Sequence, residues 1–407
     1  MHLSNRILAI DEEPFFIALN LPPGVLRLTA GEPDFPSAPF VNEYAAKAVQ
    51  EGQVHYTAPA GIQPLREGIA QKLKQENKLS YDPNEIVVTP GSSAAVVLAL
   101  LASIDPGEEV LLPDPIWFHY STLVKMAGGI PKPIKLDVKD GFVLHASEIE
   151  RVASPKSRAL ILNNPSNPTG RVLSRPELDD IAGAAERLDL TVLSDEIYEK
   201  IVYPPFIHES IGTLAGMRER TIVTNGFSKG YALMGWRVGY AAAPREMIRK
   251  LDPLLGYTLV CASSVSQHAA LESLRNPLQR EYTMKMLEAW TRRRNLVMHY
   301  VSENPDILSA RPPEGTFYAW IDVSGSGLDS KAAARTVLER ANVGVMPGYL
   351  FGENGRNHVR VSFATSDSIV GEGMERLCGV LSKVRNENGS KKDGREREGE
   401  KKELLAS

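Results

Sequence analysis

The stretch NEIVVTPGSSAAVVLALLASIDPGEEVLLPDP, residues 84–115, decides the fold class of this chain. Residues 84–91 are a short β-branched run that ends in a turn, which is typical of a buried strand. Residues 92–104 form a continuous segment of small and aliphatic residues, which predicts a buried helix. Residues 108–115 give another apolar run, so the stretch predicts a strand–helix–strand unit.

The same alternation continues along the chain. Apolar segments that start at residue 157 and span 190–198 and 220–229 are predicted strands, and residues 175–189 have apolar residues at helical spacing with a proline near the start. Repeated strand–helix–strand units predict an α/β fold with a mostly parallel sheet and helices on both faces. Because ligands of such sheets bind outside the carboxyl ends of the strands, we expect polar residues after the strands to converge on one crevice.

Composition excludes several classes of protein. The 407 residues are 43% hydrophobic and 24% charged, which is ordinary for a globular chain of two or three domains. A net charge of −4 gives no reason to expect nucleic acid or an anionic membrane as a partner. Two cysteines favour neither a disulfide framework nor a thiolate metal site. No membrane span or export signal is recognised, so we expect a cytoplasmic protein.

The sequence pattern changes after a long predicted helical stretch at about residues 265–304. Strand-like segments at 315–325, 342–352 and 357–366 alternate with predicted helices, which indicates a smaller α+β domain. We therefore divide the chain into an N-terminal segment (1–40) packing with the small domain, a large domain (41–285), the small domain (286–386) and a charged tail (387–407). The tail is rich in charge and nearly free of aromatic residues, so we expect it to be disordered.

Lys229 lies at the end of a predicted buried strand. A solvated loop lysine is the ordinary explanation, but a lysine that attacks an aldehyde must be partly neutral, which burial or nearby cations can achieve. Arg237 has a planar guanidinium that suits a phosphate or a structural ion pair. Ser92 and Ser93, at the predicted start of a helix after Gly91, suit a phosphate dianion, although Gly-Ser-Ser is also a good helix cap.

Four further residues follow predicted strands. Asp195 ends the run LTVLSD, where a buried carboxylate needs a local Arg or Lys, or the ring N–H⁺ of a cofactor, as partner. Tyr198 could direct a phenol into the same crevice. Asn167 supplies an amide within NNPSNPTG, whose prolines restrict the backbone. Trp117 is either a core residue or a platform for ring stacking.

Six segments together resemble the class I aminotransferases of the aspartate aminotransferase family, which are fold type I enzymes that use pyridoxal 5′-phosphate. The similarity extends from about residue 20 to 385 and keeps the family's order. It rests on GEPDF (31–35), YTAPAG (56–61), NPSNPTG (164–170), SDEIY (194–198), SKGYALMGWRVGY (228–240) and HVRVSF (358–363).

The resemblance implies that Lys229 holds the cofactor as an internal aldimine and then carries a proton to and from the substrate. It implies that Asp195 pairs with the protonated ring nitrogen and keeps the ring an electron sink. Tyr198 and Asn167 are implied to hydrogen-bond the ring's phenolic oxygen, and Trp117 to stack on the ring. The implied phosphate ligands are Arg237, Ser92 and Ser93.

The resemblance also implies shared sites and a substrate clamp. Tyr56 matches a tyrosine that reaches the phosphate of the neighbouring subunit, which implies a homodimer. Arg360 matches the arginine that binds the substrate α-carboxylate, with Asn167 assisting. Gly31 matches the segment that closes over the substrate through its backbone.

Two positions depart from the family's pattern. Many relatives carry a phosphate-binding hydroxyl where this chain has Gly226, and Ser228 is a candidate to compensate. Ser93 stands where some dicarboxylate-specific relatives have a lysine, and no single Arg or Lys is recognised as the partner of a distal substrate carboxylate.

The resemblance implies an enzyme that transfers an amino group from an L-amino acid to a 2-oxo acid by a ping-pong mechanism, in the manner of aspartate or aromatic aminotransferases. The same fold also hosts pyridoxal-phosphate-dependent lyases, synthases and oxidative biosynthetic enzymes, and these remain the alternative. A non-catalytic regulator is a more remote one.

Overall fold

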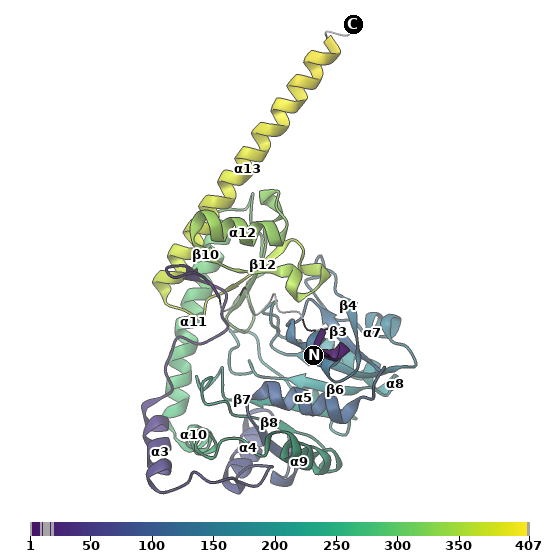
Figure 1. Ribbon diagram of the computed structural model, residues 1–407, viewed down its shortest axis with the longest axis vertical. Coiled ribbons are helices and arrows are strands. Elements are labelled where there is room, and N and C mark those ends of the chain that lie inside the picture. Colours follow the sequence, from purple (N-terminus) through teal and green to yellow (C-terminus); the bar gives the residue numbers. More distant parts are fainter. Residues whose placement is uncertain (1, 9, 11–16, 18–19, 405–407) are drawn as a thin grey trace.

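The computed structural model in Figure 1 describes residues 2–8, 10, 17 and 20–404. A large domain forms the lower part of the view and a small domain the upper part. A cleft between them contains the candidate site. Among the described residues, no helix is both long and apolar enough to cross a bilayer.

A seven-stranded sheet forms the centre of the large domain, in the order β2-β8-β7-β6-β5-β3-β4. Strand β8 runs antiparallel to its two neighbours, and the other pairings are parallel, so the predicted mostly parallel sheet is confirmed. The strands are β2 (Ile86–Thr89), β3 (Glu109–Asp114), β4 (Ile130–Lys135), β5 (Ser157–Asn163), β6 (Thr191–Asp195), β7 (Thr221–Gly226) and β8 (Gly239–Ala242).

Helices cover both faces of this sheet because its buried strands are apolar on both sides. Successive residues of a strand point to opposite faces. Accordingly, Leu112 packs in one core cluster with α5, α6 and α9, whereas its neighbour Leu111 packs in another with α7 and α8. The helices of the large domain are α3 (Pro39–Gln50), α4 (Gln63–Glu76), α5 (Ser92–Ser103), α6 (His119–Met126), α7 (Ala146–Val152), α8 (Arg175–Arg187), α9 (Arg245–Leu259) and α10 (Ser264–Arg275).

The small domain is built on the three-stranded sheet β11-β12-β9, with β9 at Tyr318–Asp322, β11 at Met346–Pro347 and β12 at His358–Ser362. Its helices are α12 (Ser330–Ala341), α13 (Asp367–Leu404) and the upper part of α11 (Leu278–Ser302), and they bury one apolar cluster against the sheet. A short parallel pair joins β1 (Leu26–Arg27) to β10 (Val343–Gly344), so this part of the N-terminal segment lies on the small domain.

Several expected boundaries meet continuous helices. The expected boundary at 285/286 falls inside α11, which runs from the large into the small domain (Figure 1). Helix α13 continues to Leu404, so most of the segment for which we expected disorder has a helical backbone here; Glu, Lys and Arg are good helix formers. Within the expected N-terminal segment and tail, residues 1, 9, 11–16, 18–19 and 405–407 lie outside the described residues. The domain boundaries stay predictions.

A hydrogen-bonded contact joins the two domains beside the cleft. Asp114, at the end of β3, is buried, and its carboxylate accepts hydrogen bonds from the backbone N–H groups of Glu353 (3.1 Å) and Asn354 (3.3 Å) in the small domain. The Asn354 amide donates to the carbonyl of Asp114 at 2.9 Å. These bonds hold the small domain beside the carboxyl end of β3.

Candidate active site

A cavity of about 300 Å³ lies at the carboxyl ends of the central strands, between the two domains. The crevice expected from the fold is therefore present. Its lining combines the ends of β5 and β6, the start of α5, a part of the N-terminal segment and the small-domain strands β9 and β12. The candidate residues that line it are Gly31, Ser92, Ser93, Trp117, Asn167, Asp195, Tyr198, Ser228, Lys229, Arg237 and Arg360.

One end of the cavity has the donors that a phosphate needs. Ser92 and Ser93 are the first two residues of α5, whose free N–H groups and positive dipole end favour an anion. Gly91 precedes them at φ +87°, and a Cβ there would lie 2.5 Å from Nη2 of Arg237. The guanidinium thus occupies the space that a larger residue would fill, beside the helix start.

Gly226 and Ser228 explain how this chain departs from the family pattern. A Cβ at Gly226 would lie 3.2 Å from the Cα of Gly239 on β8, so a side chain has little room there. Ser228 is buried and lines the cavity. Its hydroxyl is therefore available where the position of Gly226 offers none.

Lys229 is a half-buried residue whose amine lines the cavity. Its Nζ donates a hydrogen bond to the backbone carbonyl of Gly31 at 2.5 Å. Burial lowers the pKa of Lys229 to about 8, and the guanidinium groups of Arg237 and Arg360 act in the same direction. A substantial fraction of the amine is neutral near pH 8, as a nucleophile or a general base requires.

Asp195 is a buried carboxylate at the end of β6. It accepts hydrogen bonds from the Tyr120 hydroxyl (2.7 Å) and from the backbone N–H of Ile197 (3.1 Å). Burial raises the pKa of Asp195 to about 6, although these hydrogen bonds lower it. No Arg or Lys forms an ion pair with Asp195 among the described residues, so a positively charged ring nitrogen would supply the partner that it lacks.

Arg360 is a buried residue of the small-domain strand β12, and it lines the same cavity. Its Nη1 donates to Oδ1 of Asn167 at 2.8 Å, and Nη2 donates to the carbonyl of Thr29 at 2.7 Å. Its Nε has no hydrogen-bond partner within the described part of the chain. The guanidinium also lies over the ring of Tyr318, at 4.2 Å from its centroid.

Aromatic groups also line the cavity. Trp117 is half-buried, packs edge-on against Tyr120 with ring centroids 5.3 Å apart, and stacks on His119 at 3.8 Å. The hydroxyls of Tyr198 and Tyr318 are hydrogen-bonded at 3.0 Å. Tyr120 and Tyr318 were not among the residues predicted from the sequence. Tyr120 is three residues after Trp117, a helical spacing that could have indicated it.

Tyr56 is the predicted site residue that the structure leaves outside the cavity. Its side chain is 86% exposed, and it is not among the residues that line the cavity. A role in its own subunit's site is therefore not supported by the single chain.

The donor set fits a phosphorylated pyridine aldehyde. The helix start with Arg237 suits its phosphate, the buried Asp195 suits a ring N–H⁺, and Lys229 has the lowered pKa that an aldehyde-binding amine requires. Arg360 remains for a carboxylate of a second ligand.

Comparisons with known proteins agree with this chemistry. The family model "Aminotransferase class I and II" matches residues 23–379. The chain is 40% identical to an aspartate aminotransferase of Pyrococcus abyssi and 38% identical to aromatic-amino-acid aminotransferase 2 of Thermococcus litoralis, in each case over 88% of this chain and 92% of the relative. The crystal structure of an aromatic aminotransferase from Pyrococcus horikoshii superimposes with a TM-score of 0.89 at 38% identity, covering 94% of this chain and 99% of that one. This chain therefore belongs to the class I and II aminotransferase family and is a pyridoxal 5′-phosphate-dependent aminotransferase.

Proposed function

We propose that the residues of this cavity divide the work of amino transfer between an L-amino acid and a 2-oxo acid. The observation that carries this proposal is the convergence of Lys229, Asp195 and Arg360 on one cavity, with an amine of lowered pKa between a buried carboxylate and a buried guanidinium. Each of these three groups would thereby interact with a different part of the cofactor and the substrate.

The cofactor would be held by its two ends. Arg237, the N–H groups and hydroxyls of Ser92 and Ser93, and Ser228 would bind its phosphate, while Asp195 would hold its ring nitrogen protonated. When bound, pyridoxal 5′-phosphate supplies an electron-withdrawing ring that stabilises negative charge at the substrate α-carbon. Trp117 lines the cavity at a position suited to stacking on that ring.

Arg360 would bind the substrate α-carboxylate through the Nε that is left without a partner and through its Nη groups. Asn167 and Thr29 hold the guanidinium in place, so its orientation is set before the substrate enters. With the carboxylate fixed, the amine of Lys229 would take the proton from the substrate α-carbon, and its lowered pKa would let it hold that proton and give it up again. The hydroxyl of Tyr198 and the amide of Asn167 would donate to the ring's phenolic oxygen, and the backbone carbonyl of Gly31 orients Lys229.

We also propose that the preferred substrate carries an aromatic or apolar side chain. Among the described residues that line the cavity, the Lys and Arg side chains are Lys229, Arg237 and Arg360, and each already has a proposed role. Burial lowers the pKa of His119 to about 4, so it is neutral near pH 7. The remaining walls include Trp117 and Met346, which suit a ring better than a second carboxylate.

The substrate proposal is tested by comparing kcat/KM for L-phenylalanine and L-aspartate with the same 2-oxo acid acceptor. We expect the value for phenylalanine to be at least about tenfold higher, because a buried carboxylate without a cation costs well over one kcal/mol. A preference for aspartate would contradict the assignment of substrate class and leave the amino-transfer proposal intact.

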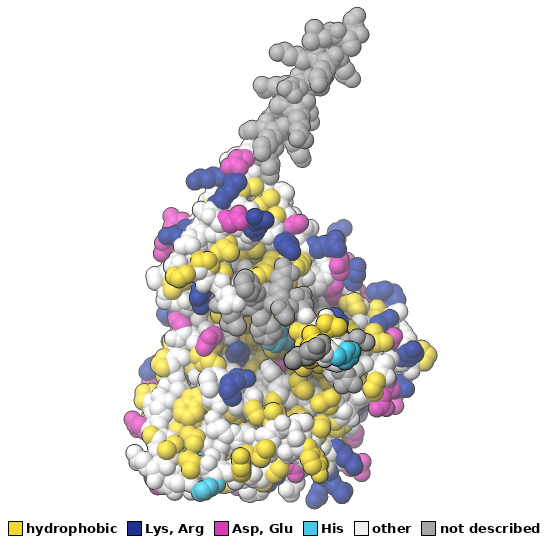
Figure 2. Space-filling view, viewed as in Figure 1, with side chains coloured by type: hydrophobic (Ala, Val, Ile, Leu, Met, Phe, Trp, Pro, Cys, Tyr) yellow, Lys and Arg dark blue, Asp and Glu magenta, His cyan; other side chains and the backbone are white. Residues whose placement is uncertain are grey.

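We further propose a homodimer in which Tyr56 completes the site of the neighbouring subunit. Its support is a surface with exposed aromatic and aliphatic groups. Tyr56 and Tyr257 are 86% and 93% exposed, and Pro59 packs against Gly256, so the two segments are neighbours. In the view of Figure 2, hydrophobic side chains are numerous on the lower part of the molecule, where Figure 1 places α4 and α9, and charged side chains are denser on the small domain.

Mixing two inactive variants tests this arrangement directly. Tyr56→Ala damages the residue given to the partner, and Lys229→Ala removes the amine of the same subunit's site. A mixed dimer then contains one intact site, so we expect activity to reappear on mixing under conditions of subunit exchange. Activity that stays at the level of the separate variants, with mixed dimers demonstrated by mass, would contradict the shared site.

Amino transfer itself is tested by a single half-reaction. L-phenylalanine added to the purified enzyme without an acceptor should change the absorbance of the cofactor and release one equivalent of 2-oxo acid per site, whereas Lys229→Ala should show no such turnover. Release of ammonia without an acceptor would instead favour a lyase or an oxidative enzyme.

A further inference from the structure

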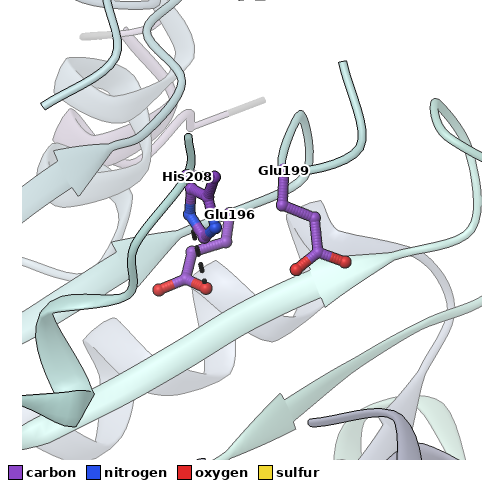
Figure 3. A group of neighbouring side chains, drawn as sticks. All are labelled: Glu196, Glu199 and His208. Atoms are coloured by element: carbon purple, nitrogen blue, oxygen red, sulfur yellow. Dashed lines mark ion pairs between the residues drawn. The ribbon is translucent and has the colours of Figure 1, made fainter. Parts of the chain in front are cut away.

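A cluster of ionisable side chains lies behind the catalytic end of β6. Asp195 and Tyr198 line the cavity, whereas Glu196 and Glu199 do not, and they gather with His208 so that their ligand atoms lie within 4.8 Å of one another. Figure 3 shows the carboxylate of Glu196 and the ring of His208 next to each other, with Glu199 alongside. Glu196 is completely buried, and the His208 side chain is 7% exposed.

Glu196 and His208 present two bare acceptors to each other. Oε1 of Glu196 accepts from the hydroxyls of Ser194 (2.9 Å) and Ser210 (2.5 Å), while Oε2 has no hydrogen-bond partner among the described residues. His208 bonds the backbone of Asn164, and its Nε2 is the ring nitrogen without a partner. Its Nδ1–H therefore donates to the Asn164 carbonyl, which leaves Nε2 as an acceptor 3.7 Å from Oε2.

Two buried acceptors at this separation require something positive between them. The nearby cation is Lys72, but its ammonium is ion-paired with Glu199 and hydrogen-bonded to Asn77 at 2.8 Å. Lys72 and Glu199 thus balance each other's charge. Glu196 also interacts electrostatically with the phenols of Tyr81 and Tyr240, which carry no positive charge. A carboxylate at Glu196 would consequently be an uncompensated buried charge.

A proton fills this gap better than a metal ion does. The three ligand atoms have a spacing that metal sites also show, but a divalent ion would lie close to the Lys72 ammonium. A proton on Oε2 converts one acceptor into a donor toward Nε2 and leaves the cluster neutral. The same direction follows from burial, which raises the pKa of Glu196 to about 7 and lowers that of His208 to about 4.

We propose that Glu196 and His208 share one buried proton, with Oε2–H of Glu196 donating to Nε2 of His208, and that the pair positions Asp195 and Asn167 for amino transfer. The other links of a ring are present in the structure, and the shared proton would draw Oε2 and Nε2, now 3.7 Å apart, into the hydrogen bond that closes it. The N–H of Asn164 donates to the carbonyl of Asp195 at 3.1 Å, His208 donates to the carbonyl of Asn164, and Glu196 follows Asp195 in the chain. Asn164 begins the loop that carries Asn167. The proposal rests on the roles proposed above for Asp195 and Asn167.

Loss of this proton would break the ring of contacts beside Asp195, the proposed partner of the cofactor's ring nitrogen. The pKa of Glu196 is higher in the folded chain than in the unfolded one, so its contribution to stability is complete at low pH and is lost as pH rises from the unfolded value toward about 7. Enzyme activity that depends on this ring of contacts should therefore fall as the pH rises through about 7.

Two variants of nearly equal size separate this role from simple packing. Glu196→Gln keeps an acceptor for the two serines and an N–H₂ donor for His208, but it cannot titrate; Glu196→Leu keeps the bulk alone. We expect the Gln variant to retain about tenfold more kcat/KM at pH 7 than the Leu variant, and to lose a limb from the pH profile that the wild type shows. Equal activities of the two variants, or a wild-type limb that persists in Glu196→Gln, would overturn the proposal.

A measurement on the intact wild-type holoenzyme removes any dependence on how the variants fold. Nitrogen NMR of His208 should show a protonated Nδ1 and a hydrogen-bonded, unprotonated Nε2 at pH 6, and infrared difference spectra against Glu196→Gln should contain the band of a protonated carboxyl. A charged His208 beside an ionised Glu196 would contradict it. So would stabilisation of the wild type, but not of Glu196→Gln, by added Zn²⁺, which would identify a metal site. Neither readout depends on substrate turnover, so failure here is distinguishable from failure of the proposed function.

Discussion

At the scale of single residues, the lowered pKa of Lys229 makes its reactivity pH-dependent in the neutral range. The amine must lose its proton to react with an aldehyde, and its pKa is about 8 because the side chain is buried. We expect the rate at which the apoprotein takes up pyridoxal 5′-phosphate to rise with pH and to level off above about 8. A rate that still increases toward pH 10, as for an ordinary lysine, would contradict the burial argument.

Asp195 should oppose stability in the apoprotein and support it with the cofactor. Its pKa rises to about 6 on folding, so the free energy of unfolding falls as pH increases from the unfolded value to about 6. Asp195→Asn should therefore stabilise the apoprotein at pH 7, by on the order of 2–3 kcal/mol, and weaken cofactor binding. Thermal unfolding of both proteins with and without the cofactor measures both effects. A lower Tm of the apo variant would be the opposite of this expectation.

How much of the site the sequence predicts depends on where each residue lies in the chain. Lys229 and Asp195 follow recognisable strands, so the rule that ligands bind at carboxyl strand ends located them together. Tyr318 was missed because it comes from the small domain, and nothing in the local pattern GTFYAW shows which face of the strand meets the cavity. The buried Glu196 was missed because the motif SDEIY draws attention to Asp195 and Tyr198 alone.

At the scale of elements, the turn between β2 and α5 is tested by a matched pair of glycines. Gly91 and Gly107 both have φ +87°, so alanine strains the backbone similarly at each. A Cβ at Gly91 would meet the Arg237 guanidinium at 2.5 Å, whereas nothing lies within 4 Å of one at Gly107.

Gly91→Ala should therefore raise the Kd for pyridoxal 5′-phosphate by about tenfold or more, since it displaces a charged phosphate ligand, while Gly107→Ala should leave the Kd close to the wild-type value. Both should lower the Tm by similar amounts. Equal Kd values in the two variants would contradict the assignment of Arg237 as a phosphate ligand.

Strands β4 and β8 were not predicted from the sequence, and each omission has a physical reason. Strand β4 has the sequence IPKPIK, and prolines argue against a central strand, but β4 is the edge of the sheet, where a missing N–H is tolerated. Strand β8 is four residues long and follows the Gly-rich stretch that carries Arg237, so its apolar run is short. Strands such as β5 and β6, which are continuous apolar runs buried on both faces, were recognised.

At the scale of the whole molecule, the charged end of the chain should be dispensable. Figure 1 shows α13 extending away from the body of the protein, and the ion pair between Arg340 and Glu387 at 3.3 Å joins two side chains that are each more than half exposed. Such pairs contribute little to stability. A chain that ends at Asn386 should keep its Tm within a few degrees and its kcat/KM within about twofold. A large loss of either would show that the tail contacts the body or a partner subunit.

The relation between the two domains could not be derived from the sequence. It depends on contacts between distant segments, such as Asp114 with Glu353 and Asn354, and on the pairing of β1 with β10. Local patterns identify the strands but give no information on which distant segment will contact them. The family resemblance supplied this long-range order in advance, because it placed the N-terminal segment and Arg360 at the same site.

The central claim is that Lys229 carries the cofactor in a cavity closed by Asp195, Arg237 and Arg360, and covalent trapping tests it most directly. The holoenzyme is reduced with borohydride, digested, and sequenced by mass spectrometry. A single phosphopyridoxyl group on Lys229, absent from the digest of Lys229→Ala, is the predicted result. A group on another lysine, or a reduced enzyme that releases all of its cofactor unbound on denaturation, would contradict the claim.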